Sequence, residues 1–224
     1  YLNGKTGVIE FILSANSSLP QNLMAEVQPI KYQARDGLTI HGYLTLPKGK
    51  APNNLPTVIF PHGGPSARDT LSFDPWAQFF ASRGYAVLQP NFRGSTGYGD
   101  QFRELGDHQW GGAMQDDVTD ATNWLINEGI ADPTKTCIVG ASYGGYSALM
   151  GAVKEPDLYK CAISINGVTN LPSMIRHEKQ FVGGRVWTKD IGLEDESAIS
   201  VSPYHLAKKI KVPVLIVHSK DDPV

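Results

Sequence analysis

The run from Thr136 to Tyr146 constrains the fold of this 224-residue chain more than any other. It reads Thr-Cys-Ile-Val-Gly-Ala-Ser-Tyr-Gly-Gly-Tyr, so an apolar β-type stretch breaks at Gly-x-Ser-x-Gly and continues into a helical pattern. A serine at such a bend sits in a strained strand-to-helix turn, and its small neighbours avoid collisions with adjacent backbone. The pattern therefore predicts a nucleophile elbow, with the hydroxyl of Ser142 pushed out of the sheet.

Short continuous apolar runs recur from residue 57 onward, with helical segments between them. The runs are Thr57–Phe60, Tyr85–Leu88, Thr136–Val139, Cys161–Ile165 and Val214–Val217. Such runs are typical of parallel strands that are covered on both faces. Apolar residues also recur at helical spacing across 114–125 and across 146–153. This alternation predicts an α/β fold, with a mostly parallel sheet and helices on both faces.

The first 46 residues follow a different pattern. A strand-like run at 8–13 leads into a polar Ser/Asn/Pro stretch. Ile30–Ala34 and Leu38–Leu46 then alternate with period two around Arg35-Asp36-Gly37, which predicts an antiparallel hairpin. We expect residues 1–26 to be a leftover strand with a linker, and residues 27–224 to be one main domain. The chain stops on a loop that leaves a strand, so we expect it to be truncated at its C-terminus.

The net charge and the distribution of charged residues indicate which classes of molecule the chain binds. The formal net charge is -2 and no stretch concentrates Lys or Arg, so neither nucleic acid nor a membrane surface is an implied partner. A small or peptidic substrate fits better, and homo-oligomerisation stays open. Cys137 and Cys161 fall in predicted buried strands, and we expect two small core residues, because a disulfide framework needs more cysteines. The compartment stays open, with the cytoplasm slightly favoured.

Acyl transfer on a serine needs three kinds of group besides the hydroxyl. An imidazole takes the proton, a carboxylate orients that imidazole, and backbone donors meet the oxyanion. The amide of Tyr143 is one candidate donor, and an amide in Pro61–Pro65, after the run that ends at Phe60, is the other. The acid is expected on a loop after a later strand, where Asp221 and Asp222 both fit.

The base is harder to place. His62 precedes the serine, whereas the triad order of this fold is Ser, acid, His, so we interpret His62 as a structural loop residue. The other five histidines fit surface or structural roles better; they are His41, His108, His177, His205 and His218. No histidine follows Asp222, so the base is expected beyond the end of the chain. With no Cys-x-x-Cys pair, His-Glu-x-x-His helix or phosphate-loop ending, the sequence predicts no metal and no cofactor.

Several stretches together resemble the catalytic domain of the prolyl oligopeptidase family, closest to its acylaminoacyl-peptidase and dipeptidyl-peptidase-like members. They are Ala34–Gly42, His62–Pro65, Asn91–Gly99, Trp110–Gly112 with Asp116 and Asp117, and Gly140–Tyr146. The resemblance covers about residues 27–224. It implies an α/β-hydrolase fold and a serine peptidase that acts on short peptides, and it implies that residues 1–26 hold the last strand of a preceding β-propeller.

The same resemblance implies roles for single residues. Ser142 would be the nucleophile, and the amides of Tyr143 and Gly64 would form the oxyanion hole. Counting from His218, in the place of the family's His-Gly-x-x-Asp, puts the acid at Asp222, although Ser219 stands where the family usually has Gly. The pocket for the residue before the scissile bond would be lined by Val168, Leu171 and Met174.

The family's catalytic histidine follows the acid by a few tens of residues. We therefore expect this chain by itself to be inactive and the intact parent to be the enzyme. A carboxylesterase on the same fold stays open as an alternative, because fold and elbow do not fix the leaving group. A non-catalytic binding domain that keeps the fold is the third hypothesis.

Overall fold

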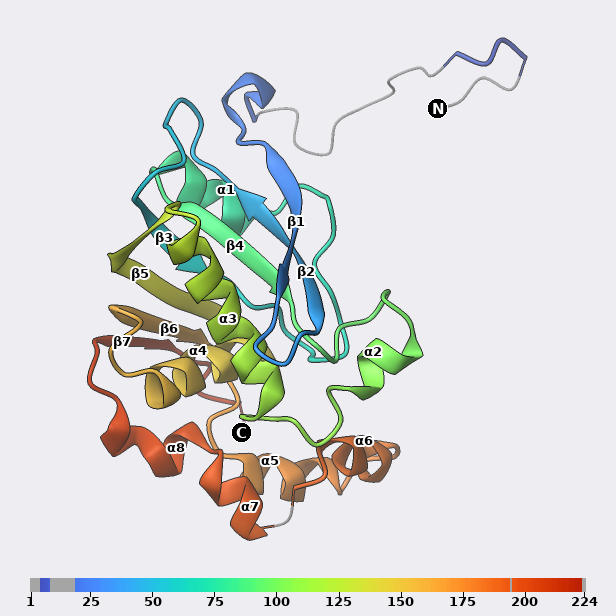
Figure 1. The fold of residues 1–224 in the computed structure, drawn as a ribbon. Helices are drawn as coiled ribbons and strands as arrows, with labels where there is room; N and C mark the ends of the chain where they lie inside the picture. The colour runs from blue at the N-terminus through green and yellow to red at the C-terminus, as the bar shows by residue number, and fades with distance from the viewer. Residues whose placement is uncertain (1–4, 9–18, 194, 223–224) are drawn as a thin grey trace.

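The computed structural model describes residues 5–8, 19–193 and 195–222, which build a seven-stranded sheet of order β1-β2-β4-β3-β5-β6-β7 (Figure 1). The strands are β1 (Val27–Gln33), β2 (Thr39–Thr45), β3 (Leu55–Ile59), β4 (Ala86–Asn91), β5 (Ala131–Ala141), β6 (Cys161–Ile165) and β7 (Val214–Val217). β1 pairs antiparallel with β2, and β2 with β4, whereas the pairs from β4 to β7 are parallel. The predicted mostly parallel sheet with an N-terminal hairpin is confirmed. The strand expected at 8–13 lies almost wholly outside the described residues.

Helices cover the two faces of the sheet unequally (Figure 1). They are α1 (Pro75–Ser82), α2 (Asp100–Glu104), α3 (Ala113–Asn127), α4 (Tyr143–Lys154), α5 (Leu171–Glu178), α6 (Gly184–Ile191), α7 (Asp195–Ser200) and α8 (Pro203–Leu206), with 3-10 turns η1 (Gln21–Leu23) and η2 (Ala207–Lys209). α3 and α4 pack on one face, and α1 packs against β4 on the other. None of the helices in the described ranges is long and apolar enough to cross a membrane.

The larger core lies between the sheet and α3 and α4. Val118 on α3, Ile138 on β5 and Ala148 on α4 are all fully buried in it. The apolar residues of α3 that recur at helical spacing in the sequence are on its buried side, as an amphipathic helix requires. A smaller cluster under α1 contains Val87 and Val139.

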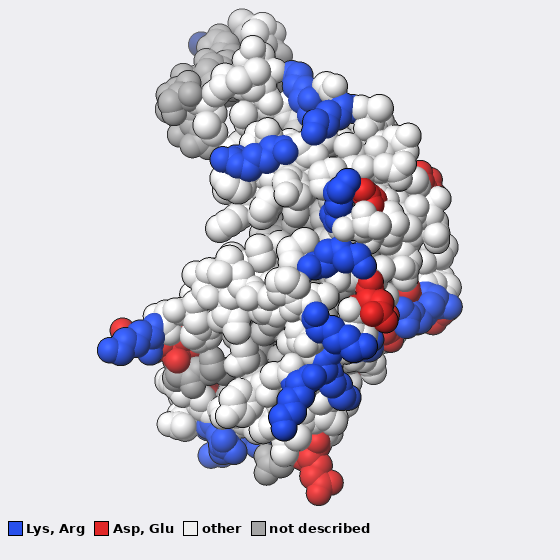
Figure 2. All heavy atoms as spheres, turned by 90° about the vertical axis from the view of Figure 1, so that its left-hand side faces the viewer, with Lys and Arg blue, Asp and Glu red and all other residues white. Residues whose placement is uncertain are grey.

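β7 departs from the expectation that each strand is covered on both faces. All four of its residues are exposed, Leu215 at 54% and Val217 at 49%. The reason is position, because β7 forms the edge of the described sheet and pairs with β6 alone. Figure 2 looks at this side of the molecule and shows Lys and Arg side chains in a line, several next to Asp or Glu, beside a hollowed and largely uncharged surface.

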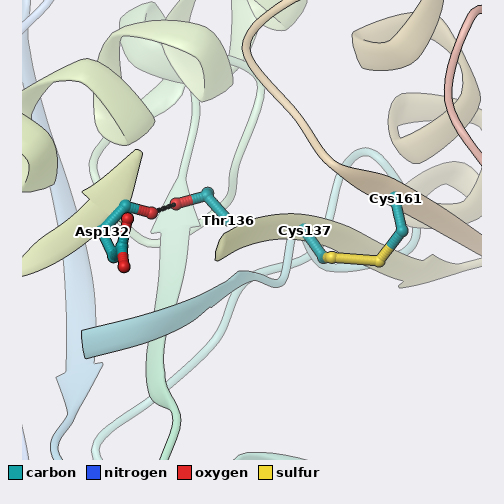
Figure 3. Close-up of a disulfide and its surroundings, with 4 residues drawn as sticks. All are labelled: Asp132, Thr136, Cys137 and Cys161. Carbon is teal, nitrogen blue, oxygen red and sulfur yellow. Dashed lines mark hydrogen bonds between the residues drawn. A yellow bond between two sulfur atoms is a disulfide. The ribbon is translucent and has the colours of Figure 1, made fainter. Parts of the chain in front are cut away.

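The two cysteines form a disulfide, which corrects the prediction that they are separate core residues (Figure 3). Cys137 on β5 and Cys161 on β6 are paired residues of the parallel ladder, with Cα atoms 4.8 Å apart. Paired residues of neighbouring strands point to the same face, within disulfide reach. A single bridge of this kind depends on strand pairing, which the spacing of two cysteines along the sequence does not show.

Candidate active site

Ser142 lies at the bend between β5 and α4 in a strained backbone conformation. Its φ is 55° and its ψ is -122°, a region that residues other than glycine rarely adopt. Gly140 and Gly144 allow the bend to close, because a Cβ on Gly140 would collide with the carbonyl of Gly144, and one on Gly144 with the carbonyl of Pro61. The strand-to-helix turn that the sequence predicts is present.

Two backbone segments run beside Ser142. The amide of Tyr143 is in the first turn of α4, where N–H groups have no partner within the helix. The loop after β3 passes close by on the other side, since a Cβ on Gly63 would lie 3.4 Å from the Cβ of Ser142. Gly64 follows with a φ of 126°, which only glycine adopts readily. Gly64 and Tyr143 line the same cavity as Ser142.

His62 fixes the conformation of this loop. Its ring stacks on Phe92 at 4.4 Å, with Nδ1 2.7 Å from the carbonyl oxygen of Gly63 and Nε2 2.8 Å from the hydroxyl of Ser95. Burial lowers the pKa of His62 to about 4, so the ring is neutral near pH 7. Nδ1–H therefore donates to the carbonyl oxygen of Gly63, and the unprotonated Nε2 lies beside the hydroxyl of Ser95, which donates to the carbonyl oxygen of Phe92 at 2.6 Å. This is a structural histidine, as the sequence predicts.

An ion pair beneath the site holds three distant segments together. The carboxylate of Asp117 on α3 accepts from Nε and Nη2 of Arg93, at 2.8 and 2.7 Å, and from the Arg93 amide. Asp36, in the turn of the β1–β2 hairpin, accepts from Nη1 of the same guanidinium at 2.8 Å. These carboxylates raise the pKa of Arg93 above its ordinary value. The loop that carries Ser95, the partner of His62, is thereby anchored to α3.

The two candidate acids differ in their surroundings. Asp222 lines the cavity and lies 3.6 Å from Nε2 of His218, whereas Asp221 is exposed. Asn166, directly after β6, positions this loop, because its Oδ1 accepts from the amide of Ser219 at 2.9 Å. Of the two aspartates, the structure brings Asp222 to the side of Ser142.

One cavity of about 230 Å³ joins these groups. Ser142, Tyr143, Gly64 and Asp222 line it together with Val168 and Met174. Leu171 is placed differently: it is fully buried in the core at the start of α5, and the described lining does not include it. Its amide donates to the hydroxyl of Ser202 at 3.0 Å, which turns α5 so that Met174 contributes to the cavity wall instead.

Besides Gly167, the cavity is lined by four more residues for which the sequence predicted no role there. They are Trp110, Asn166, Glu178 and Trp187. Asn166 could have been found, because it follows the carboxyl end of a predicted parallel strand, where sites on α/β sheets lie. Glu178 and Trp187 lie on short helices that carry no comparable signal.

Five of the six histidines contact residues outside the cavity that Ser142 lines, and the sixth, His218, lies 3.6 Å from a carboxylate oxygen of Asp222. His41 stacks on Tyr98, His108 lies 3.0 Å from the carbonyl of Lys189, and His177 and His205 pack on Phe181 and Tyr204. Within the described residues, no histidine is hydrogen-bonded to Ser142.

A profile of the prolyl oligopeptidase family matches residues 71–224. The chain belongs to the prolyl oligopeptidase family. Dipeptidyl aminopeptidase BIII of Pseudoxanthomonas mexicana is 34% identical over 97% of this chain and 34% of its own length. Dipeptidyl peptidase family member 6 of Caenorhabditis elegans is 31% identical over 96% of this chain and 33% of its own length.

Solved structures agree with this assignment. A puromycin-hydrolyzing peptidase of Mycobacterium tuberculosis superposes with a TM-score of 0.82 at 29% identity, over 93% of this chain and 33% of that one. An acylaminoacyl peptidase of Pyrococcus horikoshii gives 0.82 at 26% identity, over 97% and 37%. The chain spans about a third of the length of the curated relatives it matches. It has the α/β-hydrolase fold and is homologous to serine-type peptidases of the family.

Proposed function

We propose that the protein carrying this chain is a serine peptidase that hydrolyses short peptides through an acyl-enzyme on Ser142. One observation carries the proposal: Ser142, at a strained bend, opens into a single cavity that Gly64, Tyr143 and Asp222 also line. The homology of the chain to dipeptidyl and acylaminoacyl peptidases supports a short peptide as the substrate.

In the proposed mechanism, the hydroxyl of Ser142 attacks the carbonyl carbon before the scissile bond. The amides of Tyr143 and Gly64 donate to the oxygen that becomes negative, and the C–N bond breaks as the amine leaves with a proton. Water then hydrolyses the ester and frees the acid. The imidazole that carries the proton would be oriented by Asp222, and we place it on a residue outside these 224.

The nucleophile is tested with a fluorophosphonate, which labels only an activated serine. The intact protein should label, and Ser142→Ala should abolish labelling. Ser82→Ala, on the exposed side of α1, is the matched control and should label like the wild type. Labelling that survives in Ser142→Ala refutes the assignment of the nucleophile, and a wild type that never labels points to a non-catalytic domain.

The leaving group is tested by comparing hydrolysis of dipeptidyl amides with that of simple acyl esters by the intact protein. A peptidase should turn over the amides, and Ser142→Ala should lower kcat for amides and esters alike. Ester turnover with negligible amide turnover would instead identify a carboxylesterase.

A further inference from the structure

Glu178 places a carboxylate in the wall of the cavity that Ser142 opens into. It is the last residue of α5 and is half-buried. In the described part of the chain, its carboxylate makes no hydrogen bond and no ion pair, so its charge has no partner among these residues.

The rest of the wall strengthens this negative charge. Asp222 is the other charged residue that lines the cavity. The described residues that line the cavity include no Lys, Arg or His. Arg176 and Lys179 are close to Glu178 along the sequence, but both are exposed and neither lines the cavity. A cavity whose charged lining residues are both carboxylates attracts a cation.

The uncharged walls suit a long cationic side chain. Trp110 and Trp187 meet edge to face, with ring centroids 6.3 Å apart. Indole faces attract ammonium and guanidinium groups, and Val168 and Met174 offer apolar surface to a methylene stem. The cavity therefore provides a carboxylate for the charged head and apolar walls for the stem.

The position of the cavity identifies the part of the substrate that enters it. Its lining begins at Ser142 and Tyr143, so it lies beside the carbonyl that the serine would attack. We propose that Glu178 selects lysine or arginine as the residue whose carbonyl Ser142 attacks, through a charge-assisted hydrogen bond. This specificity rests on the proposed peptidase function.

The test uses the intact protein and dipeptidyl coumarin amides, each made with a free and with a blocked amino terminus, that differ only in the residue before the amide: Lys, Arg, Met or Glu. The wild type should prefer Lys and Arg. Glu178→Gln keeps the size and removes the charge, so kcat/KM for Lys and Arg should fall roughly 10- to 100-fold while that for Met stays within about twofold. Glu128→Gln, an exposed residue after α3, is the matched control and should change nothing.

The outcomes separate this inference from the proposed function. Hydrolysis of the Met substrate without preference for Lys or Arg overturns the role of Glu178 and leaves the peptidase standing. An equal loss on all substrates in Glu178→Gln also overturns it. A loss confined to substrates with a free amino terminus would mean that Glu178 holds that terminus instead. No turnover of any amide, together with no fluorophosphonate labelling, refutes the peptidase itself.

Discussion

At the scale of single residues, the carboxyl group of Asp69 shows how burial controls charge. Burial, and secondarily the nearby Asp74, raises the pKa of Asp69 to about 7. Its Oδ2 is buried without a hydrogen-bond partner among the described residues. The folded state therefore holds a proton between about pH 4 and pH 7 that the unfolded chain has lost, and stability falls as the pH rises through this window.

Replacing the carboxyl group of Asp69 should remove its contribution to the pH dependence of the free energy of unfolding. From pH 5 to pH 8 the wild type should lose on the order of 1–2 kcal/mol of unfolding free energy relative to Asp69→Asn, because the buried group must ionise. Urea denaturation at both pH values measures the difference. Asp100→Asn, at an exposed aspartate, is the control and should behave like the wild type. If the free energy of unfolding of Asp69→Asn depends on pH as that of the wild type does, the raised pKa of Asp69 is contradicted.

Residue positions that a local pattern defines could be predicted from the sequence, and those that depend on distant packing could not. The bend at Ser142 follows from glycine spacing along a few residues, so its strained φ was foreseeable. Glu178 enters the cavity only because α5 folds back over the site, which no local pattern indicates. The same is true of the pairing between Cys137 and Cys161.

At the scale of elements, the disulfide joins β5 and β6, the strands that lead to Ser142 and to Asn166. It closes a loop with a sequence separation of 24 residues. Chain entropy predicts that Cys137→Ala with Cys161→Ala lowers the free energy of unfolding by about 3 kcal/mol. Urea denaturation checks this, and maleimide labelling of the unfolded, unreduced wild type should find no free thiol. Two labelled thiols would contradict the bridge.

Helices and strands could be predicted where the periodic pattern of apolar residues extends over enough residues. β6 and β7 have the bounds of their apolar runs, and α3 and α4 follow the helical spacing. The helices from α5 to α8 are only four to eight residues long, so each offers at most about two turns of pattern. Of these helices, α5 and α6 supply part of the cavity wall, which is why the cavity was harder to predict than the bend at Ser142.

At the scale of the whole molecule, the ion pair between Arg93 and Asp117 connects the loop after β4 to α3, and through Asp36 to the hairpin. Asp117→Asn leaves the buried guanidinium without its charged partner, so it should lower the free energy of unfolding by about 3–5 kcal/mol. Lys135→Met breaks the ion pair between the exposed Lys135 and Asp132 and should cost much less. Urea denaturation compares the two variants, and equal losses would show that burial adds nothing.

The wall formed by α5 and α6 comes from a different stretch of sequence than the strand ends that carry Ser142 and Gly64. In the proposed peptidase, the groups that break the bond and the groups that select the substrate therefore lie in separate segments of the sequence. On that proposal, substitutions at Glu178 or Trp187 would change which substrate is bound and leave Ser142 and Gly64 unaltered.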